Sequence, residues 1–128
     1  MSRNDPRPLS PHLMHYKLPL TAYLSISHRA AGVVNSLAIV ILVIVVAAAA
    51  GSPDGYGFAG ALVDSWFGKL VLFGFTLSLY YHLCNGIRHL FWDVGIGLDL
   101  PTAMKSGYVS LAAAGALSVI TWLVAAAA

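Results

Sequence analysis

The residues best suited to bind a ligand or carry out chemistry would lie along one face of a helix. At 100° per residue they fall within about 40° of one another; they are His82, Gly86, His89 and Asp93. A neutral imidazole inside a membrane serves either as a hydrogen-bonding partner of a neighbouring helix or as an axial ligand of haem iron, so the residue type leaves both interpretations of His82 open. Gly86 favours the second slightly, because a missing side chain lets a flat macrocycle, or another backbone, come close.

The spacing of the two histidines limits how a haem could be held. Axial ligands approach the iron from opposite faces of the porphyrin, whereas His89 lies about 10 Å from His82 along the same side of the same helix. The other apolar segments of the chain have no histidine at mid-membrane depth. If two histidines hold the haem, the second one therefore belongs to another chain.

A second polar group lies where another apolar stretch begins. Adjacent turns of one helix face would carry Ser25, His28, Arg29 and Gly32. A hydroxyl and a guanidinium one turn apart can hydrogen-bond a carbonyl oxygen and stabilise negative charge on it, so Ser25 and Arg29 are candidate ligands of a quinone headgroup. In the structural alternative, His28 and Arg29 anchor the helix at the membrane interface and Ser25 bonds to a backbone carbonyl.

The composition indicates which solvent surrounds these residues. Of the 128 residues, 59% are hydrophobic and 9% are charged, whereas a soluble domain carries about a quarter charged residues. A water-soluble enzyme and a disordered tail are therefore excluded, and a net charge of +2 is too small for the basic face that a nucleic-acid partner requires. The single cysteine, Cys84, supports neither a disulfide framework nor an iron–sulfur cluster from this chain alone.

Three uncharged stretches are each long enough to cross a membrane. A helix needs roughly 20 apolar residues to span about 30 Å of hydrocarbon, and the absence of alternating polar and apolar residues excludes a barrel. We therefore predict an all-α membrane protein with three transmembrane helices in one membrane-anchor domain, residues 1–128. The predicted N-terminal interfacial segment, 1–28, includes the start of the first helix, for which Pro19 and Thr21 are suited. The predicted spans and loops that follow are, in chain order, about 29–50, 51–67, about 68–90, 91–106 and about 107–128.

The basic residues predict the orientation of the chain. Four of them precede the first span, namely Arg3, Arg7, Lys17 and Arg29, whereas the 51–67 loop has aspartates and no basic residue. Lys and Arg gather on the cytoplasmic side, so the N-terminus is predicted to be cytoplasmic and the C-terminus periplasmic. Because the chain begins at Met1 without a presequence, we expect a bacterial inner membrane rather than the mitochondrial inner membrane.

Two stretches of the sequence resemble the signatures of a known family. They are RPLSPHLMHYKLPLTAYLSISHRAAG, residues 7–32, and HLCNGIRHLFWDVG, residues 82–95. Both resemble the cytochrome b membrane-anchor subunit of succinate dehydrogenase (succinate:quinone oxidoreductase), and they occur in the order and on the spans expected for it. The resemblance covers essentially the whole chain.

The resemblance implies a role for particular residues. His82 matches the axial ligand of the haem b iron, whose partner histidine comes from a second three-helix anchor subunit. Ser25 and Arg29 match residues of the quinone site, and His28 and Arg29 match residues close to the haem propionates. Asp93 matches the acidic residue that closes the second signature, with an orienting or proton-access role.

We therefore expect a non-catalytic anchor of an oxidoreductase complex. The resemblance implies that succinate chemistry belongs to a flavoprotein subunit and an iron–sulfur subunit, that electrons pass to a quinone, and that this chain has no catalytic residue. Two alternatives stay open. The chain could anchor a quinol:fumarate reductase, or it could be a cofactor-free membrane scaffold or assembly protein in which His82 only bridges helices.

Overall fold

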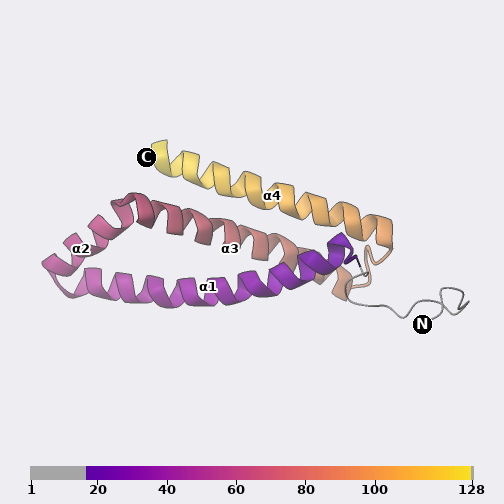
Figure 1. Cartoon of the computed structure of the whole chain (residues 1–128), viewed down its shortest axis with the longest axis horizontal. Helices are drawn as coiled ribbons and strands as arrows, with labels where there is room; N and C mark the ends of the chain where they lie inside the picture. The colour runs from indigo at the N-terminus through magenta and orange to yellow at the C-terminus, as the bar shows by residue number, and fades with distance from the viewer. Residues whose placement is uncertain (1–16, 128) are drawn as a thin grey trace, which may run out of the picture.

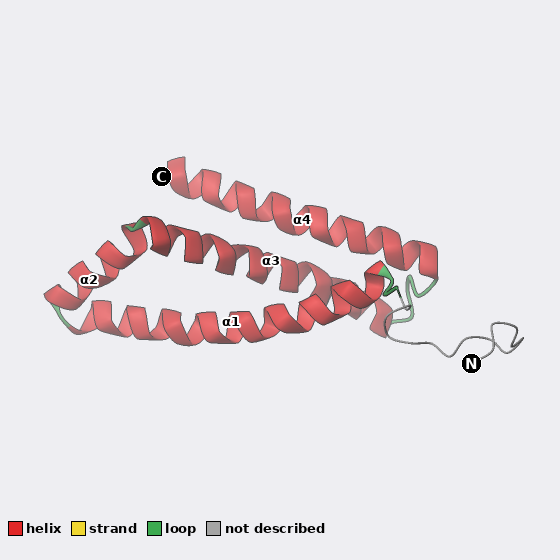
Figure 2. Cartoon of the chain, viewed as in Figure 1, coloured by secondary structure: helices red, strands yellow, loops and turns green. Residues whose placement is uncertain are grey.

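The structure is a computed structural model that describes residues 17–127. These residues form helices joined by short connections, with no strand among them (Figure 1; Figure 2). The helices are α1 (Leu20–Gly51), α2 (Pro53–Asp64), α3 (Trp66–Asp93) and α4 (Leu100–Ala127). Three of them, α1, α3 and α4, are long and apolar enough to cross a membrane. The prediction of an all-α chain with three spans is thereby confirmed, with one additional short helix.

The three long helices extend beyond the spans expected from the sequence. α1 has 32 residues and α4 has 28, which correspond to about 48 Å and 42 Å at 1.5 Å per residue, against about 30 Å of hydrocarbon. α1 begins at Leu20, next to the predicted helix start at Pro19 and Thr21, and α4 begins at Leu100, before the span predicted from about 107. The sequence criterion ended each span at a charged residue, but the helical hydrogen bonds of the backbone continue past these residues.

The helix α2 occupies most of the connection that was predicted as a loop. Ser52 caps its start, because the Ser52 Oγ accepts a hydrogen bond from the Gly55 N–H at 3.0 Å, and Pro53 follows at the first helical position. Ser65 then caps α3 in the same way through the Gly68 N–H, at 2.9 Å. The loop assignment was incomplete because these two caps, rather than apolar length, determine the helix.

The end of the molecule opposite to α2 brings three helix termini together. The start of α1, the end of α3 and the start of α4 gather there, and α3 lies between α1 and α4 (Figure 1). Asp99 caps α4, since its Oδ2 accepts a hydrogen bond from the Thr102 N–H at 3.0 Å. Hydrogen bonds with Thr102 lower the pKa of the Asp99 carboxyl, which keeps this cap ionised.

Small residues let the helices approach one another closely. The buried positions of α4 are Ala103, Gly107, Ser110, Ala114 and Ser118, spaced three or four apart as in a small-residue packing stripe. A Cβ at Gly107 would collide with Cδ1 of Leu24 from α1, which is only 3% exposed. Most large apolar side chains, by contrast, are exposed on the outside of the helices, as expected where lipid or a partner subunit is the solvent.

Candidate functional site

Three imidazoles stack between α1 and α3. The ring centroids of His28 and His82 lie 4.0 Å apart with planes 15° apart, and those of His28 and His89 lie 5.0 Å apart at 25°. His28 from the first signature therefore contacts both histidines of the second. His28, His82 and His89, which the sequence placed on two separate helices, thus form one cluster, which we call the histidine cluster.

The hydrogen bond of His82 determines which of its ring nitrogens carries the proton. Its Nδ1 lies 3.1 Å from the backbone oxygen of His28. A carbonyl oxygen only accepts hydrogen bonds, so Nδ1 carries the hydrogen and Nε2 retains a lone pair. A hydrogen bond from the ring nitrogen that does not bind the metal is the usual way in which proteins orient a metal-ligating histidine. His89 is held likewise, with its Nδ1 2.8 Å from the backbone oxygen of Asn85.

Two glycines shape the surroundings of His82. A Cβ at Gly32 of α1 would lie 3.1 Å from Cε1 of His82, so the glycine lets the imidazole lie close against that helix. A Cβ at Gly86 would meet no atom within 4 Å. The surface beside His82 on α3 is thus free of side chain.

The residues of the histidine cluster fit a haem ligand and a neighbour of its propionates. His82 offers the Nε2 lone pair that iron requires, and Gly86 leaves the adjoining surface open. The Nδ1 atom of His28 is buried and has no hydrogen-bond partner in the described part of the chain, so it can accept or donate a further bond. Residues 17–127 contain no group of three or more His, Cys, Asp or Glu side chains that could hold a metal ion.

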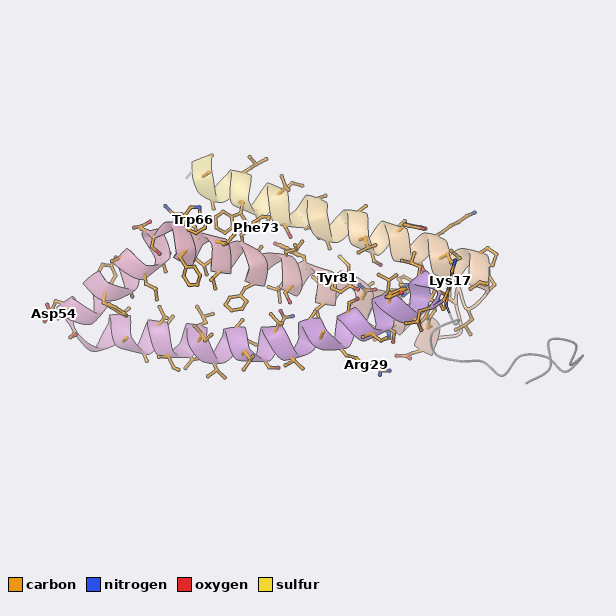
Figure 3. The ribbon with its side chains drawn as sticks, viewed as in Figure 1. Lys17, Arg29, Asp54, Trp66, Phe73 and Tyr81 are labelled. Atoms are coloured by element: carbon orange, nitrogen blue, oxygen red, sulfur yellow. The ribbon has the colours of Figure 1, made fainter. Side chains whose placement is uncertain are left out.

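The two predicted quinone ligands lie one turn apart on α1. Ser25 is half-buried and Arg29 is exposed, and Arg29 projects from α1 away from α3 and α4 (Figure 3). Neither side chain forms a hydrogen bond or ion pair with another residue of the described range. The structural alternative for Ser25 is not seen; it is Ser27 whose Oγ donates to a carbonyl of its own helix, that of Tyr23, at 2.7 Å.

Tyr81 joins α3 to α1 next to the histidine cluster, a role that the sequence did not indicate. Its hydroxyl forms a hydrogen bond with the Oγ of Ser27 and donates to the backbone oxygen of Leu24 at 3.2 Å. The available signal was its position beside His82, because a phenol hydroxyl at that depth needs a partner.

Asn85 is fully buried on α3. Its Nδ2 donates to the backbone oxygen of Tyr81 at 3.2 Å, while its Oδ1 has no partner among residues 17–127. The hydrogen bond that Asn85 forms therefore stays within α3. Asp93, the last residue of α3, is exposed, and Cys84 lies on the side of α3 that faces α4, away from the histidines.

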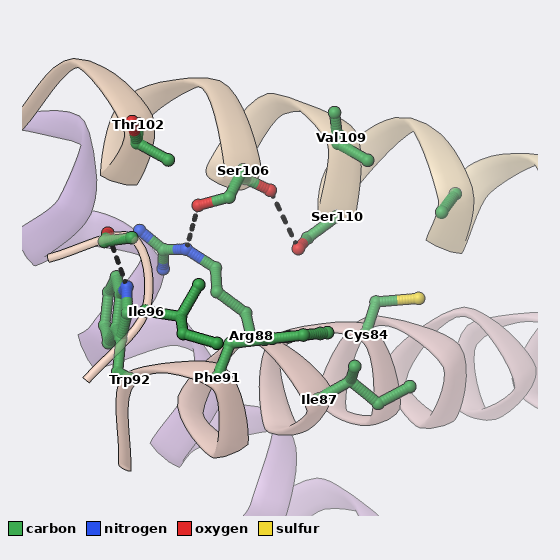
Figure 4. Close-up of a pocket in the computed structure, with 12 residues that line it drawn as sticks. Cys84, Ile87, Arg88, Phe91, Trp92, Ile96, Thr102, Ser106, Val109 and Ser110 are labelled. Atoms are coloured by element: carbon green, nitrogen blue, oxygen red, sulfur yellow. Dashed lines mark hydrogen bonds between the residues drawn. The ribbon is translucent and has the colours of Figure 1, made fainter. Parts of the chain in front are cut away.

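Arg88 lies on the α4 side of α3, opposite the histidine cluster. Its Nε donates to the Oγ of Ser106 at 3.0 Å, its Nη2 donates to the backbone oxygen of Ala103 at 2.7 Å, and its Cζ lies 4.0 Å from the centre of the Trp92 ring (Figure 4). The side chain is only 4% exposed. The sequence placed Arg88 at the inner end of the second span without indicating this burial.

Comparison with known proteins identifies the family. The model of the succinate dehydrogenase/fumarate reductase transmembrane subunit matches residues 3–124. The chain is 42% identical over 118 residues to the succinate dehydrogenase cytochrome b556 subunit of Paracoccus denitrificans, which covers 92% of this chain and 91% of that protein. It is 35% identical over 117 residues to the protein of the same name from Rickettsia felis, with 91% of each chain covered.

A mitochondrial relative also matches. The succinate dehydrogenase cytochrome b560 subunit of Sus scrofa is 36% identical over 110 residues, which cover 82% of this chain and 63% of that protein. The matches extend over both signatures and all three candidate spans. The chain belongs to the succinate dehydrogenase/fumarate reductase transmembrane subunit family.

Proposed function

We propose that this chain is the haem b-binding membrane anchor of a succinate:quinone oxidoreductase, respiratory complex II. The observation that carries the proposal is the hydrogen bond from His82 Nδ1 to the His28 backbone oxygen, at 3.1 Å, which leaves the Nε2 lone pair for iron. The names of the relatives, cytochrome b556 and b560 subunits, support haem b as the group bound. The orientation with a cytoplasmic N-terminus and the location in a bacterial inner membrane remain part of the proposal.

His82 would be the ligand that this chain contributes to the haem iron. His89 has the same tautomer but lies about 10 Å along the same face of α3, so the opposite ligand would come from a second three-helix anchor subunit. Haem b supplies a one-electron carrier when bound. His28, whose Nδ1 is buried and unpaired within the described residues, and the cation Arg29 would hold its propionates through charge-assisted hydrogen bonds.

Ser25 and Arg29 would hold the quinone that receives the electrons. The Ser25 hydroxyl donates a hydrogen bond to a carbonyl oxygen of the quinone ring, and the Arg29 guanidinium stabilises the negative charge that reduction places on that oxygen. Arg29 points away from the rest of its own chain (Figure 3). The site would therefore be completed by partner subunits, and the iron–sulfur subunit and the second anchor are the proposed ones.

The partner subunits would oxidise succinate. A flavoprotein and an iron–sulfur subunit supply the electrons, and this chain holds the assembly in the lipid membrane. The relatives favour succinate dehydrogenase over the fumarate reductase that the family also includes, because those compared are all named succinate dehydrogenase subunits.

A spectrum of the purified complex tests the haem assignment. We expect His82→Gln to lower the haem b content by more than about tenfold, since changes even to the supports of a metal ligand cost 10–100-fold in affinity. His89→Gln is the matched control, because it removes an imidazole with the same tautomer from the same helix, and it should retain the reduced-minus-oxidised bands of haem b.

Two results would contradict the assignment. Unchanged haem bands in His82→Gln would show that another residue holds the iron. Wild-type protein that contains no haem and co-purifies with no flavoprotein would favour the scaffold alternative. Loss of haem from His82→Gln is informative only where the flavoprotein still co-purifies, and this is measured in the same sample.

A further inference from the structure

A groove separates the ends of α3 and α4 on the side of α3 away from the histidine cluster. Its volume is about 460 Å³, within the range of small-molecule sites. Its apolar lining includes Ile87, Phe91, Ile96, Val109 and Ala113. Its polar lining includes Arg88, whose guanidinium lies between Trp92 and Ser106 at the end of the groove nearest the loop that joins the two helices (Figure 4).

Arg88 brings an uncompensated positive charge to this groove. Its partners are a hydroxyl, a backbone carbonyl and an aromatic ring, all of which are neutral. Its Nη1 atom has no hydrogen-bond partner in the part of the chain that the structure describes. Among these residues, an ion pair joins Lys69 to Asp64 at 3.7 Å, and none includes Arg88.

A buried cation without an anion is unfavourable in a membrane protein. Removing a guanidinium from water costs several kcal/mol, and hydrogen bonds to neutral groups offset only part of this. A neutral ligand such as a quinone could accept a hydrogen bond from Arg88 but would leave its charge in place. A phosphate would neutralise the charge and accept charge-assisted hydrogen bonds from Nη1, the nitrogen without a partner in the described part of the chain.

The groove also has the polarity gradient of a lipid. Arg88 and Trp92 lie near the end of α3, where the helix reaches the membrane interface and where tryptophan is favoured. Cys84 and Ala113 line the groove farther from these helix ends, toward the hydrocarbon. We propose that this groove binds one anionic phospholipid, with its phosphate on Arg88 and an acyl chain along Ile87 and Val109.

Lipid retention tests the proposal on the protein extracted from its membrane with the subunits that co-purify. The extract is incubated with phosphatidylglycerol or with phosphatidylcholine, and the lipids retained are counted by native mass spectrometry. We expect wild type to retain one phosphatidylglycerol. Arg88→Met, which loses the charge-assisted contact, and Val109→Phe, which fills the groove, should each bind this lipid about tenfold more weakly. Phosphatidylcholine retention should be equal in all variants.

The variants are chosen so that the test does not depend on folding. Val109 is 66% exposed, so Val109→Phe fills the groove without disturbing the buried positions and keeps Arg88. Lys105→Met removes an exposed cation from the same end of α4 and should retain phosphatidylglycerol as wild type does, which separates site binding from general attraction to the surface.

Three outcomes would overturn the proposal. Equal phosphatidylglycerol counts in wild type and Val109→Phe would show that the lipid lies elsewhere. Equal retention of the two lipids would show that Arg88 does not select charge. Loss of bound quinone, rather than phosphatidylglycerol, from Val109→Phe would assign the groove to the quinone. The test requires neither haem at the histidine cluster nor quinone at Ser25 and Arg29, so its result is independent of the proposed function.

Discussion

Helix α3 carries polar side chains on two faces at the same end of the molecule, and it uses them differently. On the face toward α1, His82 and His89 each bond a backbone carbonyl through Nδ1 and keep the other ring nitrogen available. On the face toward α4, Arg88 uses its Nε and Nη2 donors on Ser106 and Ala103. On the first face each imidazole bonds through one ring nitrogen and has no charge to balance when neutral, whereas on the second a guanidinium ties α3 to α4 and retains its charge.

This difference separates ligand binding from helix packing within one span. Ionisable residues in a membrane are costly and usually functional, but the contacts decide which function each serves. An imidazole with one nitrogen held and one free is suited to a metal. A guanidinium that bonds two groups of a neighbouring helix holds the fold, and its charge remains uncompensated within the described residues.

The largest expected effect tests whether α1 contributes residues that bind the quinone. Ser25→Ala and Arg29→Ala should each lower succinate-dependent quinone reduction by about 10²–10³-fold, the usual loss when a donor to a developing oxyanion is removed. Succinate oxidation with an artificial acceptor should be unchanged, since that chemistry does not reach the quinone. Both activities are measured on the same membranes.

Ser36→Ala is the matched control on α1. Ser36 donates to the backbone oxygen of Gly32 at 2.9 Å and is exposed, and it lies farther along the helix than Ser25. Its replacement should leave both activities unchanged. Unchanged quinone reduction in Ser25→Ala would sink the assignment of Ser25 to the quinone, whereas joint loss of the two activities would indicate failed assembly.

The three long helices could be predicted because the membrane requires a minimum apolar length, which the sequence shows directly. The helical face of His82 could likewise be predicted from periodicity. Which face of α1 packs against His82 could not be predicted. It depends on how α1 is rotated against α3 and α4, and the close contacts of Gly32 with His82 and of Gly107 with Leu24 that set this rotation are not contained in any single-helix pattern.

The burial of Arg88 was missed for a similar reason. The loop after α3 folds back because Gly95 and Gly97 adopt positive φ angles of 81° and 76°, which only glycine adopts readily. The Trp92 Nε1 then donates to the backbone oxygen of Gly97 at 3.0 Å, and the indole covers Arg88. The sequence shows the glycines, but not the direction in which they turn the chain.

A glycine on the packing face should show a smaller effect, on stability. Gly107→Ala places a Cβ against Leu24 Cδ1, and overpacking of this kind costs about 1–3 kcal/mol. Gly115→Ala is the control on the same helix, since its Cβ would meet nothing within 4 Å, and it should stabilise slightly through helix propensity. The thermal midpoints of the two purified variants are compared, and equal midpoints would show that α1 and α4 do not pack as described.

The smallest expected effect concerns the hydrogen bonds that join Tyr81 of α3 to α1 beside the histidine cluster. Tyr81→Phe removes hydrogen bonds to Ser27 and to the Leu24 backbone oxygen, and interhelical hydrogen bonds in membranes average about 0.6 kcal/mol. Tyr80→Phe is the control, because it removes one exposed bond to Thr121 on the α4 side. Both should lower the thermal midpoint slightly, but only Tyr81→Phe should also raise the KM for quinone, since it loosens the turn of α1 that carries Ser25. An equal KM for quinone in the two variants would show that Tyr81 contributes only to helix packing and not to the position of Ser25.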